Sequence, residues 1–114
     1  MTVKDVIEKI GNAESVQISL SEEDWNSLGS NASVVKLEGT PEEVNGRTLA
    51  FIKSGDLSVA KTLAIVLFCN PGDPFSMLGA IPGEEISAIG SKILYGVCCE
   101  KRPLGTVEVY ITYN

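Results

Sequence analysis

The sequence contains no histidine, and this absence excludes more chemistry than any other feature of the chain. Nucleophilic catalysis of the Ser-His-Asp and Cys-His kinds needs an imidazole base. Many zinc sites also use imidazole ligands. The side chains that remain for proton transfer are carboxylates, lysines, tyrosines and thiols. We therefore expect no catalytic site of the histidine-dependent classes.

Cysteine is also scarce, with three residues at Cys69, Cys98 and Cys99 and no Cys-x-x-Cys spacing. An odd count with an adjacent pair does not fit a disulfide framework. Adjacent residues of a strand point to opposite faces, so Cys98 and Cys99 cannot easily share one ion. We expect buried, reduced thiols that act as small apolar side chains, and neither a metal site nor a cofactor.

Basic residues are few and scattered, nine against fifteen acidic ones, which gives a formal net charge of −6. Binding to phosphates requires clustered cations, and only Lys101 and Arg102 are neighbours. The longest apolar run, Leu63–Cys69, is too short to cross a bilayer, and the first residues are charged early. We expect no nucleic-acid partner, no membrane partner, no signal peptide or transmembrane segment, and assembly in the cytoplasm.

Carboxylates occur side by side rather than in facing pairs, at Glu22-Glu23-Asp24, Glu42-Glu43 and Glu84-Glu85. A glycosidase needs two carboxylates that face each other across a sugar, which adjacent turn residues do not provide. No EF-hand spacing is present. The segment 79–83 lacks the lysine and the hydroxyl residue of a phosphate-binding loop. We therefore assign no catalytic residue, and a small carboxylate-based enzyme is the least favoured alternative.

Two short helices are expected near the start of the chain. In residues 1–12, Thr2 and Asp5 have the spacing of a capping box, and Val3, Val6, Ile7 and Ile10 recur at helical spacing. This is a short N-terminal amphipathic helix over 2–10. Ser21 then caps a second helical turn that carries Trp25.

The rest of the chain predicts strands separated by turns. Thr62–Cys69 lacks polar alternation and predicts a central strand, and the segment 106–113 alternates cleanly. Asn45-Gly46 predicts a hairpin turn before a strand over 47–53, and the segment 70–74 predicts a loop. Further strands are expected over 16–20, 34–38, 85–89 and 92–99. We see no βαβ rhythm. The prediction is one β-rich domain over 1–114, all-β or mainly β with two short helices, folded as an antiparallel β-sandwich or barrel.

The sequence favours a binding or assembly role over a catalytic one. The last strand runs to the end of the given chain, and such a strand is often an edge that can pair with a neighbour. Mean hydropathy is +0.16, high for so small a chain. We predict a non-enzymatic structural protein that forms a homo-oligomer or joins a larger protein assembly. The alternative is a carbohydrate- or protein-binding module with an exposed aromatic at Trp25 or Tyr110. The candidate interface consists of Val3, Val6, Ile7, Ile10, Trp25, Tyr110 and Tyr113.

A short capped helix followed by a compact sandwich with loops at 70–74 and 81–85 resembles small virion proteins of tailed phages. These are capsid-decoration, head-fibre and tail-accessory subunits. The resemblance covers the whole chain in style, without a diagnostic motif, and transfers no site residue. It implies a homo-oligomeric structural subunit docked on a larger particle.

Overall fold

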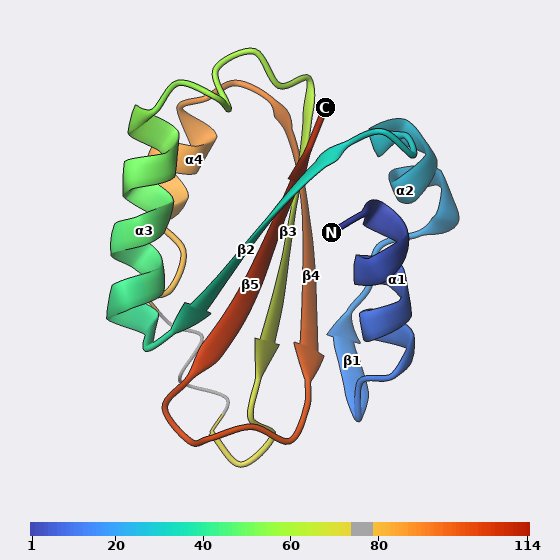
Figure 1. Cartoon of the computed structure of the whole chain (residues 1–114), viewed down its shortest axis with the longest axis vertical. Helices are drawn as coiled ribbons and strands as arrows, with labels where there is room; N and C mark the ends of the chain where they lie inside the picture. Colours follow the sequence, from blue (N-terminus) through green and yellow to red (C-terminus); the bar gives the residue numbers. More distant parts are fainter. Residues whose placement is uncertain (74–78) are drawn as a thin grey trace.

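The computed structural model describes residues 1–73 and 79–114, and its centre is one open, mixed β-sheet (Figure 1). The sheet has five strands in the order β1-β4-β3-β5-β2. Strands β3 and β4 are parallel, and every other neighbouring pair is antiparallel. The strands are β1 Ser15–Ile18, β2 Ser33–Gly39, β3 Thr62–Cys69, β4 Lys92–Cys99 and β5 Val107–Tyr113.

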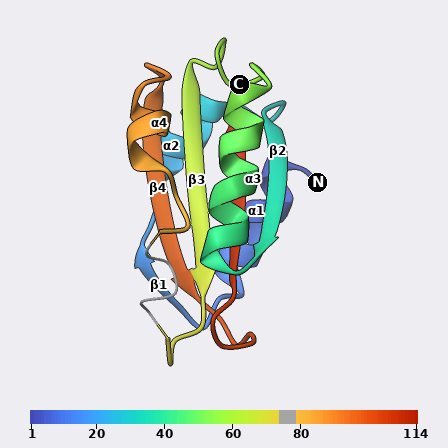
Figure 2. The same ribbon diagram turned by 90° about the vertical axis from the view of Figure 1, so that its left-hand side faces the viewer.

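Helices cover both faces of this sheet, which gives three layers. Figure 2 shows α3 and α4 in front of the sheet and α1 and α2 behind it. The helices are α1 Val3–Gly11, α2 Glu22–Leu28, α3 Pro41–Lys53 and α4 Gly83–Ser87. The predicted β-sandwich or barrel is therefore wrong, because the protein is an α/β fold with a single sheet. The sandwich implied by the resemblance to virion proteins is wrong for the same reason.

The error originates mainly in residues 41–53, which form helix α3 instead of a hairpin turn and a strand. Thr40 caps this helix in a capping box with Glu43, and Pro41 occupies the first turn, where its missing N–H costs nothing. Gly46 lies inside the helix, where a glycine costs about 1 kcal/mol relative to alanine. Burial of Val44 and Thr48 on one helix face offsets that cost.

The crossover pattern of an α/β fold was also missed. Strand β3 leads through α4 to β4, its parallel neighbour, so the predicted absence of βαβ units is wrong. Residues 85–89 were predicted as a strand, but 83–87 form α4. The last strand, β5, pairs with both β3 and β2. It is thus an interior strand, and the edges of the sheet are β1 and β2.

Several local predictions are confirmed. Thr2 caps α1 and Ser21 caps α2, each in a capping box. Strand β3 is central and buried along its whole length. All three cysteines are free and buried. Pro74, predicted as part of a loop, lies outside the described residues. In the described ranges, no helix is long and apolar enough to span a membrane.

Alternate residues of the strands build two cores. On the α3/α4 side, Leu63, Ile65 and Leu67 of β3 pack with Val44 and Ile86. On the α1/α2 side, Val66 and Phe68 pack with Val6, Cys98 and Tyr110. The alternation predicted for the last strand is confirmed, but its polar face is buried too, because α1 and α2 cover it.

Candidate functional site

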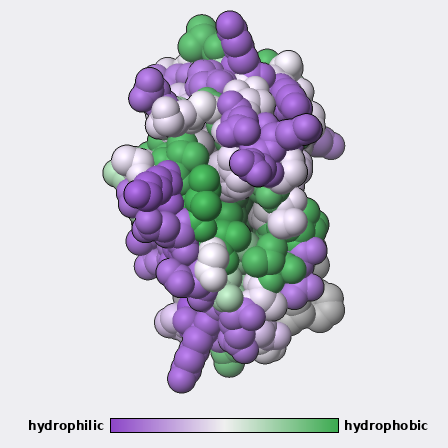
Figure 3. All heavy atoms as spheres, turned by 90° about the vertical axis from the view of Figure 1, so that its right-hand side faces the viewer, coloured by the Kyte–Doolittle hydropathy of each residue, from purple (hydrophilic) through white to green (hydrophobic). Residues whose placement is uncertain are grey.

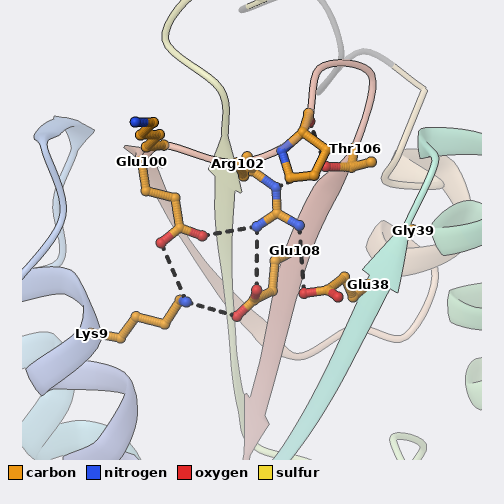
Figure 4. Close-up of a pocket in the computed structure, with 9 residues that line it drawn as sticks. Lys9, Glu38, Gly39, Glu100, Arg102, Thr106 and Glu108 are labelled. Atoms are coloured by element: carbon orange, nitrogen blue, oxygen red, sulfur yellow. Dashed lines mark hydrogen bonds and ion pairs between the residues drawn. The ribbon is translucent and has the colours of Figure 1, made fainter.

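Six charged side chains from distant parts of the chain meet at one end of the sheet. They are Lys9, Lys36, Glu38, Glu100, Arg102 and Glu108, and we call them the Arg102 cluster. Figure 4 shows all of them except Lys36. Lys9 comes from α1, Lys36 and Glu38 from β2, and Glu108 from β5, whereas Glu100 and Arg102 follow β4. The cluster therefore joins one helix to three strands.

Arg102 is the centre of the cluster. Its Nη1 lies 2.8 Å from Glu100 Oε1 and 3.2 Å from Glu108 Oε2. Its Nη2 lies 3.5 Å from Glu38 Oε2, and its Nε donates to Thr106 Oγ1 at 3.1 Å. A guanidinium has five donors in a planar fork, and four partners are placed around this one.

Glu108 is the buried carboxylate of the cluster, with 5% of its side chain exposed. Lys9 Nζ lies 3.0 Å from Glu108 Oε1, and the hydroxyl of Tyr110 donates to the same oxygen. The Lys9 ammonium also lies 5.0 Å from the centre of the Phe68 ring, a cation–π distance. These contacts fix the last turns of α1 onto the sheet.

The contacts of the cluster lower the pKa of Glu108 and raise the pKa values of Lys9 and Tyr110. Burial by itself raises the pKa of Glu108, but the hydrogen bond from Tyr110 and the contact with Lys9 outweigh it and lower this pKa to about 2. Burial disfavours the charge on Lys9, yet Glu108 and Glu100 outweigh that effect and raise its pKa. Burial and the neighbouring Glu108 carboxylate raise the pKa of Tyr110. Near neutral pH, Glu108 and Lys9 are therefore charged and Tyr110 is protonated.

A pocket of about 420 Å³ adjoins the cluster and is lined by Lys9, Glu38, Gly39, Glu100, Lys101, Arg102, Pro103, Thr106 and Glu108. The cations Lys9 and Arg102 point at carboxylates rather than into open space. Within the described ranges, no group of three or more Cys, Asp or Glu side chains could hold a metal ion. The geometry is that of a satisfied ion-pair network that stabilises the packing of α1.

The outer surface of α1 and β1 carries exposed apolar side chains, in contrast to the charged Arg102 cluster. Ile7 is 42% exposed, Val16 42% and Ile18 52%. Half-buried Ile10 and Leu20 pack onto the core on the α1/α2 side of the sheet. Figure 3 shows apolar side chains in a stripe on this side of the molecule, bordered by hydrophilic ones. We call Ile7, Ile10, Val16, Ile18 and Leu20 the α1–β1 patch.

The exposed charged side chains next to this patch along the chain are mostly acidic. Residues 1–28 contain six acidic side chains and two basic ones. Of the two basic side chains, Lys9 turns toward the Arg102 cluster, and Lys4 is exposed and lines a groove with Ile7. The exposed acidic side chains are Asp5, Glu8, Glu14, Glu22 and Glu23. The patch is thus an apolar surface within a negative field.

A second pocket, of about 480 Å³, lies between α1 and α2. It is lined by Thr2, Val3, Lys4, Ile7, Trp25, Asn26, Gly29 and Ser30. Ile7 therefore contributes both to this groove and to the α1–β1 patch. Trp25 is half-buried, so part of its ring is available from outside.

The predicted interface residues differ in burial and do not form one exposed surface. Val3, Val6 and Tyr110 are buried in the protein's own core. Ile10, Trp25 and Tyr113 are half-buried, and Ile7 alone among the seven is exposed. Most of the apolar face of α1 thus packs on the sheet. The sequence missed Val16 and Ile18, which it placed on a half-buried strand, because β1 is an edge with a bulge and little cover.

The Arg102 cluster was also missed. The available signal was Glu108, a charged residue between Val107 and Val109 in a strand pattern, two positions from Tyr110. A buried charge in a strand needs partners. Its partners Lys9 and Lys36, however, come from elements far away in the sequence.

Comparisons with known proteins identify the fold but no family. No family model matches the chain, and no curated protein matches it. Among solved structures, it is similar to a tryptophan-to-tyrosine mutant of FtsZ from M. jannaschii, with a TM-score of 0.63 and 14% identity over 89% of this chain. A second structure, described as an empty FtsZ dimer from the same organism, has a TM-score of 0.57 and 14% identity over 88% of this chain.

The match lies in the C-terminal region of FtsZ. The chain spans about a third of the length of these FtsZ chains, 33% and 32%. At this identity the likeness shows the arrangement of the sheet and helices alone.

Proposed function

We propose that the protein is a non-enzymatic assembly subunit that docks on a partner protein through the α1–β1 patch. The observation that carries this proposal is the exposure of Ile7, Val16 and Ile18 beside mostly acidic side chains. Exposed apolar patches with polar rims are typical of protein-binding surfaces.

The acidic side chains beside the patch determine the kind of partner. A second copy of this chain brings the same negative field to the interface, and like charges across an interface are unfavourable. A segment with apolar side chains flanked by lysines or arginines matches both the patch and these acidic side chains. We therefore infer a basic, amphipathic partner segment, in place of the homo-oligomer expected from the sequence.

Both edge strands of the sheet are poorly suited to pairing with an added strand, which favours docking through side chains. Strand β1 has four residues and a bulge next to its pairing with β4. Strand β2 carries the charged Lys36 and Glu38, and Arg47 Nη1 donates to the Glu38 carbonyl at 3.0 Å. Short, bulged or charged edges discourage pairing with another strand.

The Arg102 cluster gives no support to the carboxylate-based enzyme. A general acid needs a carboxyl group whose pKa is raised toward neutrality. Glu108 has its pKa lowered to about 2, and its oxygens contact Lys9, Arg102 and Tyr110. The resemblance to virion proteins adds nothing to the proposal, because it rested on a sandwich.

The experiment is a titration with two helical peptides, one of leucine and lysine and one of leucine and glutamate. Trp25 is the single tryptophan and lines a groove to which Ile7 of the patch also contributes, so its fluorescence reports on binding there. We expect the lysine peptide to bind and the glutamate peptide not to bind. The double variant Val16→Thr with Ile18→Thr should weaken binding about tenfold or more, because a hydroxyl replaces a methyl group at Val16 and an ethyl group at Ile18 in the buried interface.

Val59→Thr is the matched control, since Val59 is 83% exposed in the connection between α3 and β3. Equal binding of both peptides, or equal loss in the control, contradicts the proposal. Light scattering measures the native mass and so tests the rival partner, a second copy of this chain. A discrete oligomer that the double variant dissociates would identify the occupant as a second copy.

The groove beside Trp25 favours one second candidate, a carbohydrate-binding module. It combines part of an indole ring with the polar side chains of Asn26 and Ser30. Sugars stack on aromatic rings and hydrogen-bond to such groups. A glycan that binds wild type but not Asn26→Ala, with unfolding unchanged, would support this candidate.

A further inference from the structure

Two of the three cysteines lie next to each other on neighbouring strands. Cys69 and Cys99 are paired in register at the ends of the parallel strands β3 and β4. Their sulfur atoms are 3.9 Å apart. Both side chains belong to the core on the α3/α4 side, whereas Cys98 packs into the core on the other side.

The backbone spacing at this pair suits a covalent link. Neighbouring strands lie about 4.8 Å apart, within the range of about 4.4–6.8 Å that Cα atoms of disulfides span. The sulfur atoms need to approach from 3.9 Å to about 2.05 Å, which side-chain rotation supplies without breaking the strand pairing. Cys98 points to the opposite face of the sheet and packs into the other core, away from this pair.

We propose that Cys69 and Cys99 form a dithiol site that a small disulfide oxidant converts into an intramolecular disulfide. With glutathione disulfide as the oxidant, the Cys99 thiol loses its proton, attacks one sulfur of the oxidant and releases one glutathione thiolate. Cys69 then loses its proton, attacks the Cys99 sulfur and releases the second. Two protein thiols are oxidised, one oxidant disulfide is reduced, and both protons end on the two glutathione molecules.

Cys99 is the first sulfur to react because it is the more accessible of the two. It is 6% exposed, whereas Cys69 is fully buried. The exposed residue Gln17 lies over it, with Nε2 4.0 Å from Cys99 Sγ. Burial raises the pKa of Cys69 to about 11, so the second attack, by Cys69 on the Cys99 sulfur, is slow at neutral pH and accelerates as the pH rises.

A disulfide at this position would act on the Arg102 cluster. The N–H of Glu100 donates to the Cys69 carbonyl at 2.9 Å, and Asn70, which follows Cys69, donates through its side chain to the Arg102 carbonyl. The link would therefore lie directly beside two residues that hold the cluster together.

The test is oxidation of the folded protein with glutathione disulfide, followed by alkylation and peptide mapping. We expect two thiols to disappear, the mass to fall by about two hydrogens without retained glutathione, and the Cys69 and Cys99 peptides to be linked. Cys98 should remain alkylatable, and dithiothreitol should restore all three thiols.

Alanine variants of the three cysteines provide matched controls. Cys98→Ala should oxidise like wild type, whereas Cys69→Ala and Cys99→Ala should form no intramolecular link. A link that involves Cys98, three surviving thiols after prolonged oxidation, or a stable glutathione adduct on Cys99 beside a free Cys69 would overturn the proposal. If a variant does not fold, the peptide map of the wild type still decides.

Discussion

Replacement of Glu108 by glutamine tests the energetics of the Arg102 cluster. The pKa of Glu108 falls from its ordinary value of 4.5 to about 2 in the folded protein. One pKa unit corresponds to about 1.4 kcal/mol, so the ionised carboxylate contributes about 3 kcal/mol to the free energy of unfolding at neutral pH. We expect Glu108→Gln to lose about this amount, a large part of the stability of a small domain.

The same shift predicts the pH dependence of unfolding. Because the pKa of Glu108 is lower in the folded state, the unfolded state binds more protons in the interval between the two values. The stabilisation is complete above about pH 5 and is lost as the pH falls toward about pH 2. The difference between wild type and Glu108→Gln should shrink across this interval.

Urea unfolding followed by Trp25 fluorescence, repeated between acidic and neutral pH, measures both quantities. Glu14→Gln is the control, because Glu14 is exposed and makes no ion pair among the described residues. It should change stability by no more than about 0.5 kcal/mol. A loss below about 0.5 kcal/mol in Glu108→Gln at neutral pH, or a difference that stays constant in acid, would refute this reasoning.

Three further predictions concern the fold. Val6→Ala should lower the free energy of unfolding in urea by about 2 kcal/mol, because Val6 is fully buried. Ile7→Ala should lower it by less than about 0.5 kcal/mol, because the neighbouring Ile7 is exposed. Equal losses in the two variants would contradict the orientation of α1. Thr40→Ala should cost about 1 kcal/mol by removing the cap of α3, and an unchanged unfolding midpoint would count against a helix over 41–53. Gly96→Ala should displace the Leu20 side chain at little cost in stability, because a Cβ there would lie 2.8 Å from Leu20 Cδ1, the far end of a flexible side chain. A changed methyl shift of Leu20 in NMR spectra would confirm that contact, and unchanged Leu20 methyl shifts would contradict the packing of Leu20 against β4.

Local signals in the sequence were sufficient for the elements that depend on local physics. The capping boxes at Thr2 and Ser21 define the starts of α1 and α2, and the unbroken apolar run of β3 predicts a strand covered on both faces. The error at 41–53 came from giving Asn45-Gly46 more weight than the capping box Thr40–Glu43 and the helical spacing of the apolar residues Val44, Phe51 and Ile52. We therefore expected a strand where α3 lies, and α3 is one of the helices that make the fold α/β.

The site was harder to predict because its members meet through tertiary structure. Lys9 and Glu108 are 3.0 Å apart in space but lie at opposite ends of the chain. Their contact depends on the position of β5 inside the sheet, and the sequence predicted β5 as an edge. The exposure of Val16 and Ile18 likewise depends on β1 being at an edge, which no local pattern reveals.

Mapping the lysine-containing peptide by amide chemical shifts tests docking through the α1–β1 patch most directly. We expect shifts at Ile7, Val16 and Ile18 and at the indole N–H of Trp25, with none at Val59. Shifts centred on the acidic first turns of α3 and α4, at Glu42, Glu43, Glu84 and Glu85, would show that the peptide follows charge alone. That result would contradict docking through the α1–β1 patch.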